Sequence, residues 1–102
     1  MAHVSSYSHI TRANIPQEIW DEAWFTVQSW KSYLQSFPGF FAVRFSARGL
    51  DGGDIRFHVV TVWEYAEQLE EWLGSDWSAE SLLKSLQKPA YDIDSETYED
   101  IG

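Results

Sequence analysis

The sequence contains no cysteine, which excludes disulfide bonds, thiolate nucleophiles and thiolate metal ligands together. Basic side chains are also scarce: seven lysines and arginines stand against sixteen aspartates and glutamates, for a formal net charge of −9. This charge repels phosphate backbones and anionic membrane surfaces, so we expect neither nucleic acid nor a membrane as a partner. No apolar run approaches the roughly 20 residues of a membrane span, and residues 1–13 lack the pattern of a secretion signal. We therefore expect a soluble, cytoplasmic protein.

Aromatic residues, in contrast, are abundant. They make up 17% of the 102 residues and include six tryptophans. So many large apolar side chains can bury a substantial core in a short chain, which argues against disorder. The length allows one core, and we expect a single domain over residues 1–102.

The clearest structural signal is an alternating segment from Ile55 to Trp63 that leads directly into an amphipathic helix. Phe57, Val59 and Trp63 share one face of this predicted strand, and the other face also becomes apolar toward its end. A strand that is apolar on both faces needs cover on both, and the helices of so short a chain supply only one layer. We expect the second layer to come from another copy of the chain.

The remaining elements follow from the same kind of pattern. A predicted first helix begins at Asn14, with Gln17 three residues later as in a capping box, and ends at Pro38-Gly39. Asp51-Gly52 marks a hairpin turn. Strands are predicted over 4–11, 40–48, 55–63 and 91–98, and two further helices over 64–73 and 78–87.

This β-α-β-β-α-β order predicts an α+β fold, the ferredoxin-like split βαβ arrangement with helices on one face of an antiparallel sheet. The bare face favours a homodimer with the architecture of a dimeric α/β barrel. We expect a charge placed at Phe45 or Val60 to split or unfold the dimer, if that side of the sheet is the one buried between subunits.

The chain resembles the antibiotic biosynthesis monooxygenase family of small dimeric α/β barrels. The resemblance rests on Pro38-Gly39-Phe40, on the segment from Thr61 to Asp76, and on the element order. It implies a cofactor-independent monooxygenase that acts on a small aromatic or quinol-like, polyketide-type substrate.

Two branches of this family differ from the chain at functional positions. In the haem-degrading branch Trp72 matches the helix tryptophan, but Leu82 stands where the iron-ligating histidine is expected, and Tyr7 falls near the position of an asparagine. Without an axial imidazole we expect no haem. In the polyketide-quinol branch only the strand tryptophan is matched, by Trp63. The asparagine, tyrosine and arginine of that branch are replaced here by Val59, Leu69 and Leu83, respectively.

The implied reaction needs a base, and His9 and His58 are the candidates because imidazole titrates near neutrality. The alternative for each is a half-exposed strand histidine that makes a local hydrogen bond. Arg44 lies among apolar residues and is the candidate to hold an anionic substrate or stabilise an oxyanion; its alternative is an ion pair with a carboxylate.

The candidate substrate pocket is formed by Tyr7, as a hydrogen-bond donor, and by Trp63 and Trp72, as walls for a flat ligand. Tryptophans at these spacings are also typical of a core. The three histidines and the acidic run do not form a metal-ligand pattern, and we expect neither metal nor other cofactor. The alternative to an oxygenase is a non-catalytic module of the same fold that binds a small hydrophobic ligand or only dimerises.

Overall fold

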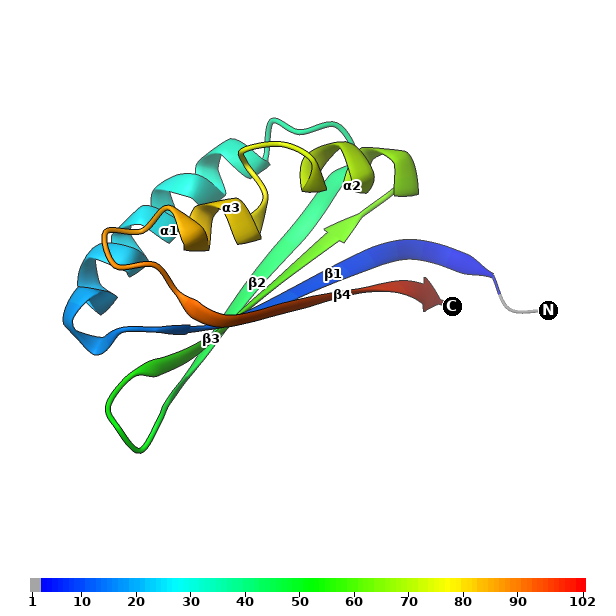
Figure 1. Cartoon of the computed structure of the whole chain (residues 1–102). Coiled ribbons are helices and arrows are strands. Elements are labelled where there is room, and N and C mark those ends of the chain that lie inside the picture. Colours follow the sequence, from blue (N-terminus) through cyan, green and yellow to red (C-terminus); the bar gives the residue numbers. More distant parts are fainter. Residues whose placement is uncertain (1–2) are drawn as a thin grey trace.

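The computed structural model describes residues 3–102 and confirms the ferredoxin-like arrangement. A four-stranded antiparallel sheet has the order β2-β3-β1-β4, and all the helices lie on one side of it, leaving the other side bare (Figure 1). The elements are β1 (Val4–Ile15), the 3-10 helix η1 (Gln17–Ile19), α1 (Trp20–Leu34), β2 (Phe40–Gly49), β3 (Ile55–Trp63), α2 (Ala66–Leu73), α3 (Ala79–Lys84) and β4 (Tyr91–Ile101).

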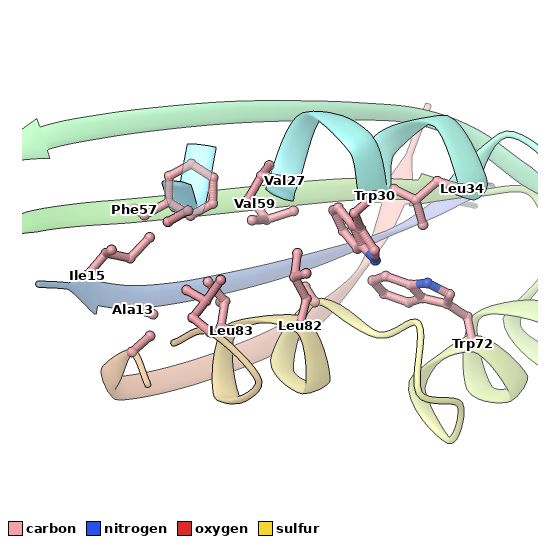
Figure 2. Packing of buried hydrophobic residues seen from close by; sticks show 14 of the residues in the cluster. Ala13, Ile15, Val27, Trp30, Leu34, Phe57, Val59, Trp72, Leu82 and Leu83 are labelled. Carbon is pink, nitrogen blue, oxygen red and sulfur yellow. The ribbon is translucent and has the colours of Figure 1, made fainter. Parts of the chain in front are cut away.

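The core lies between the sheet and the helices, and the alternation of β3 accounts for it. Phe57, Val59 and Trp63 are buried on the helix side, as the sequence pattern predicts. Leu82 and Leu83 of α3 point into the same layer (Figure 2). Burying one such side chain stabilises the fold by about 1.5–3 kcal/mol, so the two-residue period fixes which side the helices cover.

The first helix begins later than predicted. Asn14 does not cap it, because Asn14 lies inside β1 and pairs with Arg56 of β3. The chain turns at Pro16, whose backbone is extended and which provides no side-chain cap. α1 then begins at Trp20. Pairing with both β3 and β4 offers residues 12–15 more backbone hydrogen bonds than an early helix start would, and this tertiary pairing overrides the local capping pattern.

β2 also differs in one detail from the predicted alternation. The register shifts between Phe40 and Ala42, so Phe40 packs against Trp63 while Phe41 is 76% exposed. A bulge of this kind reverses the face of the residues on one side of it, which a strict two-residue period cannot anticipate. Beyond the bulge, Phe45 faces the helices and contacts Trp24, so Phe45 does not belong to the bare face, whereas Val60 does.

The two later helices are shorter than predicted. α3 covers six residues rather than ten. It is capped at its N-terminus by Ser78, whose hydroxyl accepts a hydrogen bond from the Ser81 backbone N–H at 3.2 Å. None of the helices in residues 3–102 has the length and apolar character needed to cross a membrane.

Candidate functional site

The candidate catalytic residues do not lie on one side of the sheet. His9 faces the helices, because its neighbours Thr11 and Ala13 on the same face of β1 are buried there. His58 and Arg44 lie on the bare face, since each alternates with a residue buried on the helix side. Within one subunit the three side chains therefore do not come together in one site: His9 lies on the helix side, and His58 and Arg44 lie on the bare side.

His9 is held between the strand β4 and the helix α3. Its Nδ1 lies 2.8 Å from the hydroxyl of Thr97, within hydrogen-bonding distance. Its Nε2 lies 3.8 Å from a carboxylate oxygen of Glu80, too far for a direct hydrogen bond. The same carboxylate oxygen accepts a hydrogen bond from the Ser95 hydroxyl at 2.8 Å, which fixes its position.

Burial governs the protonation of this imidazole. His9 is only 4% exposed, and removal from water lowers its pKa below the ordinary value, against the opposing charge of Glu80. The ring is therefore neutral near pH 7. The Glu80 carboxylate favours the proton on Nε2, which leaves Nδ1 to accept a hydrogen bond from Thr97. A neutral imidazole with a nearby carboxylate is the arrangement expected of a general base.

Trp63 and Trp72 are fully buried core residues rather than walls of an open cavity. Their ring centroids are 5.1 Å apart, and Trp72 also meets the His9 ring edge to face at 6.0 Å. Trp30 of α1 completes the cluster beside Trp72 (Figure 2). Trp63 and Trp72 thus lie on the same side of the sheet as His9, and the burial of the two tryptophans matches the core alternative.

The two tryptophans differ in how their N–H groups are satisfied. The indole N–H of Trp63 donates to the Thr61 hydroxyl at 3.0 Å. The buried indole N–H of Trp72 and the buried Nε2 of His9 have no hydrogen-bond partner among the described residues, and neither does the Thr11 hydroxyl. Buried polar atoms without partners are rare in folded proteins, so these three atoms mark the part of the core around His9 as incompletely hydrogen-bonded.

A surface hollow reaches Thr97, the residue that is hydrogen-bonded to His9. It has a volume of about 330 Å³ and opens between α2 and the ends of β1 and β4. Thr97 belongs both to the wall of the hollow and to the hydrogen bond with His9. Tyr7, a predicted pocket residue, lines it as well, and the full lining is Tyr7, Ala66, Leu69, Glu70, Leu73, Thr97, Tyr98 and Glu99. This size is at the lower end of the range for small-molecule sites.

Sequence reasoning did not identify Thr97 and Glu80. Thr97 sits in an acidic strand in which no single hydroxyl stands out, and Glu80 is one of many helix carboxylates. The pairing register would have found Thr97, because His9 and Thr97 are directly opposed on adjacent strands. That register becomes visible only after the sheet order is known.

The bare face of the sheet surrounds His58 with cations. Burial, and then the charges of Arg12, Arg56 and Arg48, lower the pKa of His58, while Asp94 opposes them. The ring shares a shallow hollow of about 290 Å³ with Arg48 and Arg56. This setting disfavours imidazolium, and among residues 3–102 no carboxylate makes a hydrogen bond or ion pair with His58.

The described residues do not fit a metal or haem site. Among residues 3–102, no three histidine, aspartate or glutamate side chains come close enough to hold a metal ion. Leu82, at the position where the haem-degrading branch has its ligand, is buried in the apolar core.

No known family profile matches the chain, and no curated protein matches it significantly. Solved structures of antibiotic biosynthesis monooxygenase proteins nevertheless match nearly its whole length. One such monooxygenase has a TM-score of 0.72 and 13% identity, covering 94% of this chain and 99% of the other. A mutant of SnoaB, a cofactor-independent oxygenase from Streptomyces nogalater, has a TM-score of 0.70 and 11% identity, covering 94% and 93%. The heme-degrader MhuD from Mycobacterium tuberculosis, with two hemes in its active site, has a TM-score of 0.66 and 21% identity, covering 94% and 99%.

These likenesses show the fold, that of the dimeric α/β barrels. Identities of 11–21% do not show a shared activity, and the matched proteins themselves differ in chemistry. The function must therefore be argued from the residues of this chain.

Proposed function

We propose that the protein is a cofactor-independent monooxygenase that oxidises a small, electron-rich aromatic compound, with His9 as its general base. The observation that carries this proposal is a neutral, buried imidazole whose Nδ1 is hydrogen-bonded to Thr97 in the wall of an open hollow. The SnoaB likeness supports the reaction class by analogy of fold alone.

The reaction needs no external reductant. His9 removes a proton from an activated CH₂ or phenol of the substrate, and the resulting anion transfers one electron to dioxygen. The two radicals combine to form a C–O bond, giving a hydroperoxide after protonation. Loss of water then leaves a carbonyl. One oxygen atom of O₂ enters the product and the other leaves in water, while the CH₂ carbon is oxidised to C=O, so atoms and electrons balance.

Thr97 and Glu80 have distinct roles in this proposal. Thr97 lines the hollow, its hydroxyl lies 2.8 Å from His9 Nδ1, and in this proposal it passes the substrate proton to that nitrogen. The Glu80 carboxylate, 3.8 Å from Nε2, stabilises the imidazolium that forms. Because Glu80 is partly exposed, it also gives the proton a route to solvent.

The test is oxygen uptake with a panel of anthrones and hydroquinones, without added flavin, haem or metal. We expect uptake above autoxidation, a loss of about 10²–10⁴-fold in kcat for His9→Gln, and a smaller loss for Thr97→Val. Glu80→Gln should move the acid limb of the kcat/KM profile to lower pH, because Glu80 raises the pKa of His9. Glu71→Gln, an exposed carboxylate outside the hollow, is the matched control. Wild-type turnover by His9→Gln would remove the proposed base.

The alternative function is non-catalytic binding of a small hydrophobic ligand. Arg44, the candidate to stabilise an oxyanion, lies on the opposite side of the sheet. Among the described residues of the same subunit, no arginine or lysine lines the hollow, and this favours the binding alternative. Tight binding of a flat aromatic compound without oxygen consumption would support this alternative over the oxygenase.

We also propose that the chain forms a homodimer through the bare face of the sheet. The fold is one that typically dimerises, and Ile10, Val60 and Val62 on this face are only half-buried in the isolated chain. Sedimentation equilibrium should give twice the chain mass of 11.8 kDa.

A further inference from the structure

The bare sheet face carries an unusual share of the positive charge of the protein. Only seven residues of the chain are lysine or arginine, and four of these are arginines. All four arginines project from the bare face, because each alternates along its strand with a residue directed at the helices; they are Arg12, Arg44, Arg48 and Arg56. The three lysines lie in α1, α3 and the loop after α3.

The charges on this face are also divided between its two edges. Arg44 and Arg48 lie on the edge strand β2, and neither makes an ion pair among residues 3–102. The opposite edge strand, β4, carries the carboxylates Asp94, Glu96 and Asp100. In the interior of the face the remaining arginines already have partners: Arg12 lies 3.4 Å from Asp94 and from Glu96, and Arg56 lies 3.2 Å from Asp94.

One row across the sheet shows this division most simply. The register aligns Arg44 with Val60, Val60 with Ile10, and Ile10 with Glu96. The row therefore runs from a cation on β2, through two apolar side chains, to an anion on β4. Three strand spacings of about 4.8 Å separate its ends, so Arg44 and Glu96 of one chain are too far apart to pair with each other.

We infer that two copies pack by this face about a two-fold axis parallel to the strands, so that Arg44 of each copy pairs with Glu96 of the other. This inference rests on the proposed homodimer and adds the orientation of its subunits. A two-fold axis along the strands places β2 over β4 of the second copy, and the row meets itself reversed. Val60 of each copy then packs on Ile10 of the other at the centre, with ion pairs at both ends.

The other symmetric arrangement is electrostatically unfavourable. A two-fold axis across the strands would place β2 over β2 and bring Arg44 and Arg48 of both copies together, with the carboxylates of β4 opposed at the other edge. Like charges facing one another across an interface are destabilising and select against that orientation.

The inference predicts a charge-exchange experiment with two variants, Arg44→Glu and Glu96→Arg. In the homodimer of either variant, like charges face each other at both ends of the row. The dissociation constant of that homodimer should therefore rise by about tenfold to several hundredfold relative to wild type. An equimolar mixture restores opposite charges at both ends, so a heterodimer should form with nearly wild-type affinity. Native mass spectrometry of chains with different tags counts the heterodimers, and Lys31→Glu and Glu67→Arg, which make the same charge changes on the helix side, are the controls.

The possible results separate the dimer from its orientation. Weak homodimers with a restored heterodimer support the inference. A folded wild-type monomer at 100 μM would overturn both the homodimer and its orientation, whereas a tight wild-type dimer whose variants dimerise unchanged, or whose mixture gives no heterodimer, would overturn the orientation alone.

Glu96→Arg also removes the pair with Arg12, so a second measurement is needed if that variant does not fold. The dissociation constant of the wild-type dimer should then rise between 0.05 and 0.5 M NaCl. The dissociation constant of Arg44→Gln should rise less over the same range. A wild-type constant independent of salt would contradict the pairing.

Discussion

The unpartnered N–H of Trp72 makes a prediction that compares two equivalent substitutions. Trp63 and Trp72 are both fully buried, and their rings are in contact. Replacing either with phenylalanine removes the same atoms, so the transfer and cavity contributions to the free energy of unfolding largely cancel between the variants. What remains is the difference in hydrogen bonding.

That difference has a definite sign. Trp63→Phe removes a 3.0 Å hydrogen bond and leaves the buried Thr61 hydroxyl without its partner, whereas Trp72→Phe removes a buried N–H that has none. Leaving a buried polar group unsatisfied costs about 1–3 kcal/mol, and removing an unsatisfied one recovers a similar amount. Trp63→Phe should therefore be the more destabilising by about 2 kcal/mol or more. For a domain of this size the difference in Tm is at least roughly 8 °C.

Urea unfolding followed by circular dichroism, with all chains at one concentration above the dimer dissociation constant, measures this difference. The reasoning is refuted if Trp72→Phe destabilises the protein as much as Trp63→Phe. In that case the Trp72 N–H has a partner in solution, and repeating the comparison after exhaustive dialysis would show whether that partner is an exchangeable small molecule.

Three further predictions concern the turn, a helix cap and pH. Gly53→Ala should lower the free energy of unfolding by about 1 kcal/mol, because Gly53 has a φ of +97° and an added Cβ would overlap Gln17, while Gly52→Ala in open space should change it little. Ser78→Ala should destabilise α3 by about 1 kcal/mol, measured by thermal unfolding. Because burial lowers the pKa of His9, the folded chain binds fewer protons than the unfolded chain just below pH 6.5, so stability falls as the pH decreases there. His9→Gln should lose less stability than wild type between about pH 7 and about pH 5; an equal loss in both would show that His9 does not contribute.

The parts of the fold that sequence predicts well are those in which local pattern and tertiary contact agree. β3 is an example: its alternation fixes Phe57, Val59 and Trp63 on the helix side and its bounds match the prediction. The start of α1 is a counterexample. Asn14 satisfies the local pattern of a helix cap, but strand pairing with Arg56 extends β1 through it.

The candidate site was harder to predict for a similar reason. The start of β1 is mostly polar and contains a histidine, so its alternation gives two sets of residues without showing which set faces the helices. The sequence therefore makes His9 a candidate but does not distinguish it from His58. The contribution of Thr97 depends on pairing with a strand some ninety residues away, which no local pattern encodes.

The division of roles between the two faces of the sheet follows from the two-residue alternation of side chains along β1. His9 and Thr11 face the helices, where burial keeps an imidazole neutral, and Ile10 and Arg12 face outward, where exposure favours charge and a second subunit. A slip of one residue in the register of β1 would exchange these sets and place Arg12 in the core and His9 among the arginines. The proposed chemistry and the proposed subunit orientation therefore depend on the same register. Residue-specific substitutions on one face should consequently leave the function of the other intact, and a change of register should abolish both.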